Sequence, residues 1–340
     1  MEPSVDFQHL VRTGLSGGHA VAQQLTGCAA QLAGYDELEA YRAHLASKTV
    51  CLTMLAGAGT RWLSSLASLA RMPDGYTPQM PRALFPVHNA TGCGPNPIPI
   101  GAYALMAVRG LGTHVIVVRG WEDVITSRIL SPLGIQPADV RFVSQKEANG
   151  KPRGHGDAAW QAMDQWRTAE YVLVNFGGDA SSPDTAFRAL ATMDALCRTQ
   201  TELPALVLPV ASMKDPAYPI GVDADGLPVS FGHAKLQGLK PSATAALSYT
   251  NVGIRVYRAK ALEELVSKAA SLWRQPNGLW AVPGNDPDGG EFALDNVDAE
   301  FAHAGKARLL AIASSDELTP VKSLGDIPGF EKAVSRLWHE

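Results

Sequence analysis

The chain has 340 residues, a length that predicts either two domains or one large α/β domain with appendages. Hydrophobic residues make up 46% of it and charged residues only 18%, which excludes a disordered chain. The 29 basic and 33 acidic side chains give a net charge of −4, so there is no general basic field to attract nucleic acid or anionic lipid. We therefore expect neither partner, and any phosphate chemistry must depend on a few local cations.

Neither a membrane anchor nor an exported chain is indicated. Apolar stretches such as those at 115–118 and 171–174 fall far short of the ~20 residues that a membrane helix needs. The N-terminus lacks a basic region followed by an apolar core, so no secretory signal is expected. Four widely spaced cysteines have no histidine at zinc-ligand spacing: Cys28, Cys51, Cys93 and Cys197. We interpret them as reduced thiols in a cytoplasmic enzyme.

Residues 1–48 are predicted to form a helical extension, because Leu38, Tyr41 and Leu45 recur at three- and four-residue steps. From residue 49 onward, short apolar strands alternate with amphipathic helices, which is the pattern of βαβ units. Strands are expected at 50–55, 114–118, 140–143, 171–175, 205–210, 251–256 and 308–313. Helices are expected at 100–109, 122–130, 156–166, 183–197 and 259–272.

This order predicts an α/β fold with a Rossmann-like, mixed, mostly parallel twisted sheet flanked by helices. The main domain is expected to span residues 49–326, followed by a C-terminal helix at 327–340. Two segments rich in proline and glycine, 72–99 and 275–290, are predicted to be long loops.

A loop of small residues follows the first predicted strand. Small residues let a backbone approach a ligand, successive amides can bind an anion, and an arginine at the end supplies charge for phosphate. The loop does not fit the dinucleotide pattern G-x-G-x-x-G, because Trp62 stands where the third glycine would be. For this loop alone, a tight structural turn is an equal alternative. Its residues are Leu55, Ala56, Gly57, Ala58, Gly59, Thr60 and Arg61.

A second basic segment, residues 80–87 with the sequence MPRALFPV, places Arg82 twenty-one residues after Arg61. Together the two segments resemble the sugar-1-phosphate nucleotidyltransferases, also called nucleotide-sugar pyrophosphorylases. The signature of that family is L-A-G-G-x-G-T-R followed by P-K-x-L-x-P-V. This chain departs from it at Ala58, which replaces a glycine, and at Arg82, which replaces the lysine and offers a planar fork of donors. The resemblance implies the fold of that family, with Arg61 and Arg82 on the triphosphate and the departing pyrophosphate.

Further along the chain, Gln145 precedes residues 153–159, with the sequence RGHGDAA. This arrangement resembles the base-binding segment of the family, and its G-H-G-D form is similar to that of the UTP-using UDP-glucose pyrophosphorylase branch. A glutamine amide both donates and accepts hydrogen bonds, so it can discriminate between nucleobase edges. The resemblance implies that Gln145, Gly154 and His155 contact the nucleotide. The alternative is a solvated Gln145 and an ordinary helix N-cap within 154–157.

The predicted strand at 171–175 is followed by Gly177, Gly178 and Asp179. In open parallel sheets, ligands collect at the carboxyl ends of the strands. The aspartate resembles the metal-binding aspartate of the family, which implies that Asp179 holds Mg²⁺ against the nucleotide phosphates while water fills the other positions. The alternative is that Asp179 caps the helix that begins near Pro183.

Two later segments complete the resemblance. Residues 249–254, YTNVGI, resemble the N-x-G-I strand of the family, which implies that Asn251, together with Gly178, contacts the sugar. Residues 318–323, LTPVKS, with Asp326 beyond them, resemble the ending of eukaryote-type UDP-sugar pyrophosphorylases, in which the lysine, here Lys322, faces phosphate. The glutamate that usually precedes the N-x-G strand is missing, so the sugar is unassigned. An ordinary strand and a solvated lysine are the alternatives for these segments.

The sequence therefore predicts a transferase that joins a nucleoside triphosphate, UTP by resemblance, to a sugar 1-phosphate, with Mg²⁺ as cofactor and pyrophosphate as second product. Two alternatives stay open: a nucleotide-binding homologue that has lost catalysis, and a transferase that uses guanosine or another base with a sugar-like phosphate. A Rossmann oxidoreductase is disfavoured by the failed glycine pattern and by the lack of an acidic residue ~20 positions later. The oligomeric state is not predicted. The predicted catalytic residues are Arg61, Arg82, Asp179 and Lys322.

Overall fold

The computed structural model describes residues 26–339, apart from 28, 32, 58–59, 90, 92–95, 146–152, 213–218, 224–225, 232–248, 284–289 and 313–314. The described strands form one ten-stranded sheet and a separate two-stranded sheet of β2 and β3. They are β1 Thr49–Met54, β2 Pro86–Val87, β3 Ile98–Pro99, β4 Thr113–Val118, β5 Val140–Ser144, β6 Tyr171–Phe176, β7 Leu206–Ser212, β8 Ile220–Val222, β9 Pro228–Phe231, β10 Tyr249–Asn251, β11 Ile254–Arg258 and β12 Ala307–Ala311.

The large sheet has the strand order β5-β4-β1-β6-β11-β7-β10-β8-β9, and β12 pairs with β7 outside this path. β5, β4, β1 and β6 run parallel to one another, and so do β12 and β7. The five other pairings among the described strands of this sheet are antiparallel. The sheet is therefore mixed, as predicted, but it is parallel over only part of its width and not over most of it.

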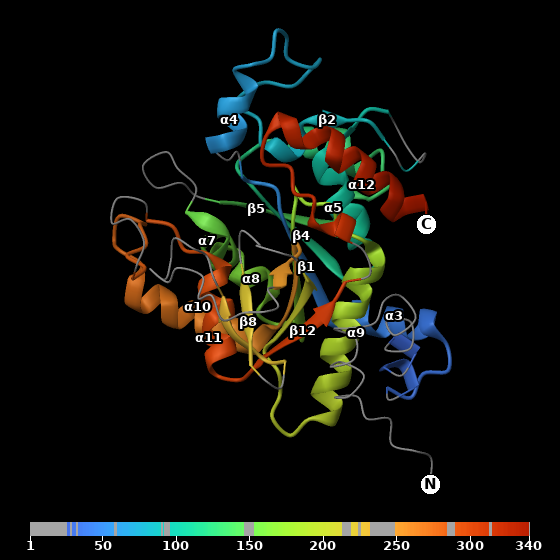
Figure 1. Cartoon of the computed structure of the whole chain (residues 1–340), viewed down its shortest axis with the longest axis vertical. Helices are drawn as coiled ribbons and strands as arrows, with labels where there is room; N and C mark the ends of the chain where they lie inside the picture. Colours follow the sequence, from blue (N-terminus) through green and yellow to red (C-terminus); the bar gives the residue numbers. More distant parts are fainter. Residues whose placement is uncertain are drawn as a thin grey trace.

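Helices cover both faces of the large sheet (Figure 1). α3 and α9 pack on one face, whereas α7, α10 and α11 pack on the other. The described α-helices are α3 Leu38–Lys48, α4 Thr60–Leu66, α5 Ile100–Ala107, α6 Glu122–Ile125, α7 Gly154–Gln161, α8 Met163–Trp166, α9 Pro183–Thr199, α10 Ala259–Trp273, α11 Leu294–His303 and α12 Ile327–His339. The 3-10 turns are η1 Arg82–Leu84, η3 Pro137–Asp139, η4 Ser315–Leu318 and η5 Leu324–Asp326, and η2 Thr126–Leu130 is a π turn.

The two faces of the sheet follow from the alternation of strand side chains. In β1, Val50 and Leu52 join the core beneath α7, α10 and α11, whereas Cys51 between them joins the core beneath α3 and α9. In β6, Val172 joins the core beneath α7, α10 and α11, and Leu173 joins the core beneath α3 and α9. Almost every β1 and β6 side chain is buried, which explains why these strands appear in the sequence as continuous apolar runs.

The predicted strand at 251–256 is two strands in the structure. β10 pairs with β7 and β8, and β11 pairs with β6 and β7, so the chain changes neighbours at Val252 and Gly253. The carbonyl of Gly253 accepts a hydrogen bond from the Phe176 amide at 3.2 Å. This break places Gly253 at the carboxyl end of β6.

Two helices, α3 and α12, pack on the central part of the chain from either side in sequence. α3 lies within the predicted extension of residues 1–48, and residues 1–25 lie outside the described residues. Tyr41 of α3 is fully buried and donates a hydrogen bond to Asp194 of α9 at 2.9 Å. α12 buries Phe330 and Val334, and the Phe330 ring lies 5.5 Å from that of Tyr103 in α5. α12 therefore shares a hydrophobic cluster with α5, and Tyr41 of α3 belongs to the cluster beneath α9.

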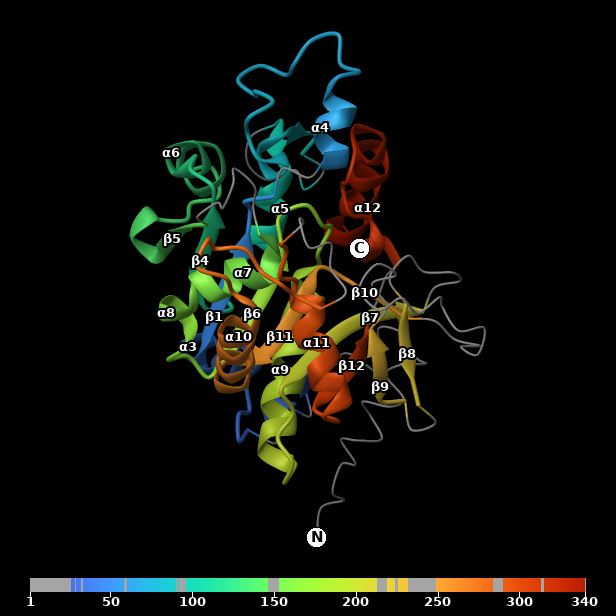
Figure 2. The same cartoon turned by 90° about the vertical axis from the view of Figure 1, so that its left-hand side faces the viewer.

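α4 and α12 lie at the same end of the molecule in both side views (Figures 1 and 2). β1 runs toward this end, since α4 follows it directly in the chain. Within the residues described, no helix combines the length and the apolar character that crossing a bilayer requires.

Candidate active site

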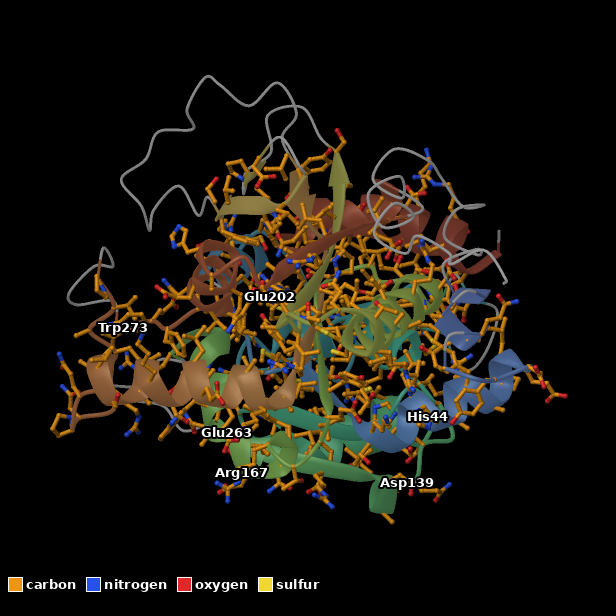
Figure 3. All side chains as sticks on the ribbon, turned by 90° about the horizontal axis from the view of Figure 1, so that it is seen from below. His44, Asp139, Arg167, Glu202, Glu263 and Trp273 are labelled. Atoms are coloured by element: carbon orange, nitrogen blue, oxygen red, sulfur yellow. The ribbon has the colours of Figure 1, made fainter. Side chains whose placement is uncertain are left out.

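The predicted catalytic residues lie at the end of the sheet where the parallel strands terminate. β1 and β6 are neighbours and end together, because Met54 pairs with Phe176. The chain passes from β1 to β4 and β5 on one side and then continues with β6 on the other, so the strand order reverses at β1. Ligands of open α/β sheets bind outside the carboxyl ends of the strands at such a reversal. Figure 3 views the opposite end, where His44 precedes β1 and Asp139 precedes β5.

Arg82 reaches this end of the sheet from η1. Its guanidinium lies against Gly178, and a Cβ atom at position 178 would stand 2.7 Å from Arg82 Cζ. Burial lowers the pKa of Arg82, while the negative charge of Asp179 raises it and the positive charge of Arg61 lowers it further. The buried Nε of Arg82 has no hydrogen-bond partner among the described residues. An unsatisfied buried donor costs about 1–3 kcal/mol, so an anionic ligand at this point would stabilise the arginine.

Asp179 follows the turn after β6 and packs against Gly253 at the start of β11. A Cβ atom at position 253 would lie 2.7 Å from Asp179 Cβ, so this close approach requires glycine. Burial raises the pKa of the Asp179 carboxyl, and the charges of Arg82, Lys322 and Arg255 act in the opposite direction. Three cations therefore act on this one carboxylate.

The helix-cap alternative for Asp179 is wrong. The N-cap of α9 is Ser182, whose hydroxyl accepts hydrogen bonds from the amides of Asp184 and Thr185. Asp179 lies three residues before this cap and forms an isolated bridge with Pro320 instead. Its position is therefore determined by the sheet end and by the segment that carries Lys322.

Lys322 lies on the chain that crosses this end of the sheet after β12. The amide of Val321 donates to the carbonyl of Gly178 at 2.7 Å, directly beside Asp179. The amides of Lys322 and Ser323 both donate to Asp326 Oδ2, at 2.8 and 2.7 Å. These bonds hold the backbone on both sides of the lysine, and the lysine charge acts on Asp179.

The loop after β1 leads to Arg61. Leu55 and Ala56 are buried, and the amide of Leu55 donates to Val117 of β4 at 2.9 Å. Gly57 is exposed, and no atom lies within 4 Å of a Cβ built there, so packing does not demand a glycine at this position. Ala58 and Gly59 lie outside the described residues, and Arg61 is exposed in the first turn of α4.

Gln145 follows β5 and is buried rather than solvated. Its Nε2 donates to the Gly154 carbonyl and to Asp157 Oδ2, at 3.0 Å each. The Asp157 carboxylate also accepts from Gln161 Nε2 at 2.6 Å and from Trp280 Nε1 at 2.8 Å. Because both N–H groups of Gln145 are used inside the protein, only its carbonyl oxygen is left to contact a base.

The glycines at the start of α7 have a packing explanation. A Cβ atom at Gly156 would lie 2.8 Å from the Phe292 carbonyl oxygen, and Gly154 has a φ of +87°. The Phe292 carbonyl accepts the amide of Gly156 at 2.9 Å, so a backbone group takes the place of an N-cap side chain. Asp157 lies inside the helix and does not cap it.

His155 faces the end of β6. Its ring centroid lies 5.1 Å from that of Phe176, and its Nδ1 accepts the amide of Leu294 at 2.8 Å. Nδ1 therefore carries no proton, and Nε2 lies 3.6 Å from Asp295.

Asn251 is half-buried at the end of β10, two residues before Gly253. Two residues of extended chain span about 7 Å, so Asn251 lies within that distance of the contact between Gly253 and Asp179.

Arg255 is a site residue that the sequence analysis missed. It is only 2% exposed, its Nε donates to Asp298 at 2.8 Å, and its Nη2 donates to Asp295 at 2.8 Å. Its guanidinium lies 5.1 Å from the ring centroid of Phe176. Burial acts to lower the pKa of Arg255, but the two carboxylates outweigh it and raise that pKa. The available signal was a charged residue within an otherwise apolar strand, IRVYR.

A magnesium ion fits this site only together with phosphate. Among the described residues, no three His, Cys, Asp or Glu side chains are arranged to hold a metal. Asp179 supplies one carboxylate, and Mg²⁺ sites commonly combine one or two carboxylates with substrate phosphates and water. The surrounding cations oppose a free metal ion but attract a metal–polyphosphate complex.

No model of a known protein family matches this chain, and no curated protein sequence is significantly similar to it.

Proposed function

We propose that the protein catalyses nucleotidyl transfer, in which a nucleoside triphosphate and a sugar 1-phosphate give a nucleotide sugar and pyrophosphate. The observation that carries this proposal is the arrangement of Arg82 and Lys322 around Asp179 at the reversal point of the sheet, with the charge of Arg61 acting on Arg82. Arg61, Arg82 and Lys322 outnumber the carboxylates of Asp179 and Asp326, and this net positive charge suits a polyanionic substrate.

The chemistry of this transfer needs no general base. An oxygen of the sugar phosphate is already ionised and attacks the α-phosphorus in line, so catalysis reduces to positioning and charge neutralisation. Arg61 and Arg82 bind the β- and γ-phosphates and remain bound to the departing pyrophosphate. Lys322 binds the sugar phosphate, and Asp179 holds Mg²⁺, which neutralises charge between the two substrates.

The arrangement around Gln145 supports UTP or GTP as the nucleotide, and the motif resemblance favours UTP of the two. Asp157 orients the amide so that its carbonyl oxygen is the group left for a base. An acceptor of this kind pairs with a base that carries a ring N–H on its pairing edge, as uracil and guanine do. Cytosine and adenine present a bare ring nitrogen there, and could offer this oxygen only the amino group beside it.

Pyrophosphate release tests the proposal. Protein with Mg²⁺ is incubated with each of the four common triphosphates and a panel of sugar 1-phosphates, with and without a chelator. We expect release with UTP and a hexose 1-phosphate, and none after chelation. If no pair gives product above the blank while UTP still binds, the alternative of a nucleotide-binding protein without catalysis replaces this proposal.

A further inference from the structure

Residues 315–326, called the strap below, cross the site from α9 to α4. At its first end, Glu317 of η4 contacts the start of α9. In its middle, Pro320 forms a bridge with Asp179, and Val321 bonds to Gly178. At its second end, the amide of Leu324 donates to Ser65 Oγ of α4 at 3.1 Å.

Glu317 is an unusual anchor because it is only 2% exposed. Its Oε1 accepts the Thr185 hydroxyl at 2.7 Å, and its Oε2 accepts the Ser182 amide at 3.3 Å. These groups belong to the N-cap and the first turn of α9. The nearby charged groups on α9 are Arg188, which donates to Thr185, and Asp184, which pairs with Arg188.

The remaining charges near this anchor are paired elsewhere. Asp316, the neighbour of Glu317 in η4, forms an ion pair with Arg336 of α12. The bond from Glu317 to α9 is therefore a separate attachment of the strap, and it lies five residues before Lys322.

We propose that Glu317 is a positioning residue that docks the strap on α9 and thereby places Lys322 beside Asp179. Docking stands on the contacts above, whereas the effect on sugar phosphate binding rests on the proposed function.

A pH profile separates this role from general stabilisation. Burial raises the pKa of Glu317 to about 7, although the Thr185 and Ser182 hydrogen bonds and the Arg188 charge oppose this rise. In the docked strap, Glu317 therefore keeps its proton up to a higher pH than it does when the strap is undocked and Glu317 is solvated. Docking weakens as pH rises toward 7, and the neutral Glu317→Gln variant should lose this dependence.

Hydrogen exchange of the full chain measures docking without any substrate. The probe is the protection factor of the Val321 amide, corrected for intrinsic exchange, between pH 5 and 8. In the unmodified protein we expect protection to fall at least tenfold over this range. Glu317→Gln should make it flat, and Glu317→Ala should lower it at least tenfold at pH 5. The control is Glu300→Gln, an exposed residue of α11 that should behave like the unmodified protein.

The anchoring role would be overturned if the Val321 amide of Glu317→Ala kept its wild-type protection. It would also be overturned if Glu317→Gln kept the wild-type pH dependence of that protection. A kinetic arm then tests the link to Lys322. Glu317→Ala should raise the KM for sugar phosphate about tenfold and leave the KM for the nucleotide unchanged. In a Lys322→Ala background the same change should have no further effect. Additive losses would show that Glu317 does not act through Lys322, while absence of all turnover would count against the proposed function and leave the exchange result standing.

Discussion

Replacing Gly178 with alanine should displace the side chain of Arg82 while residue 82 itself stays an arginine. The new Cβ would stand 2.7 Å from Arg82 Cζ, whereas carbon atoms in contact are ordinarily about 3.5–4.0 Å apart. The guanidinium must therefore move by about 1 Å. A misplacement of this size can cost about a hundredfold in rate when the group positions a reacting phosphate.

The fold should tolerate this substitution. The group that must move is the end of a long side chain, and Gly178 does not have the positive φ that would strain an alanine. Replacing glycine also reduces the entropy of the unfolded chain, so we expect the free energy of unfolding to stay within about 1 kcal/mol of the wild-type value.

The assay compares kcat/KM and denaturant unfolding for Gly178→Ala with those of a control, Gly329→Ala. Gly329 lies in α12, where a Cβ would meet only Thr319 Cγ2 at an ordinary 3.7 Å. We expect a loss of about a hundredfold in kcat/KM for Gly178→Ala and none for the control. In an Arg82→Ala background, Gly178→Ala should cost nothing more. Full activity in Gly178→Ala would refute the claim that the position of Arg82 matters.

Four further predictions concern single groups. Asp179→Asn should reduce turnover by orders of magnitude, because the metal ligand is lost. It should not lower the free energy of unfolding at neutral pH, because burial raises the pKa of Asp179 and so disfavours its ionised form in the folded protein. A large loss of stability with normal turnover would contradict both expectations. If the planar fork of Arg82 binds two phosphate oxygens, Arg82→Lys should lower kcat/KM by an amount that corresponds to ~1–3 kcal/mol of transition-state stabilisation. Full activity in Arg82→Ala would remove this residue from the site. Asp157→Asn should narrow the preference for UTP over CTP because it frees the Gln145 amide to turn, and an unchanged ratio would exclude Gln145 from base recognition. The free energy of unfolding should fall by up to about 3 kcal/mol as pH rises from about 4.5 to 7, because folded Glu317 keeps its proton in this window and the unfolded chain does not; denaturant titrations of Glu317→Gln should show a smaller slope, and an equal slope would contradict the assignment.

The strands were predictable because burial on both faces leaves continuous apolar runs. β1, β4 and β6 lie close to the predicted positions for this reason. β8 and β9 were not predicted, since each is short and only partly buried and so lacks a clear period. The antiparallel pairing of β11 was also beyond the sequence, because it depends on which strands become its neighbours rather than on its own residues.

The candidate site was predictable where chemistry follows a strand directly, as with Asp179 after β6. Arg255 was not, because its role depends on Asp295 and Asp298 of α11, forty and forty-three residues away. The partners of Gln145 were equally hidden. Spacing shows that an amide is near a glycine-rich helix start, but only the fold shows that Asp157 takes its N–H.

An isotope experiment tests the central claim most directly. A hexose 1-phosphate labelled with ¹⁸O in its phosphate oxygens is incubated with UTP, Mg²⁺ and the protein, and both products are analysed by mass spectrometry. In-line attack by the sugar phosphate on the α-phosphorus predicts that the nucleotide sugar retains all of the label and that the pyrophosphate contains none. The two products should form in equal amounts, and Asp179→Asn should form neither. Label in the pyrophosphate, or pyrophosphate without any nucleotide sugar, would contradict nucleotidyl transfer at this site.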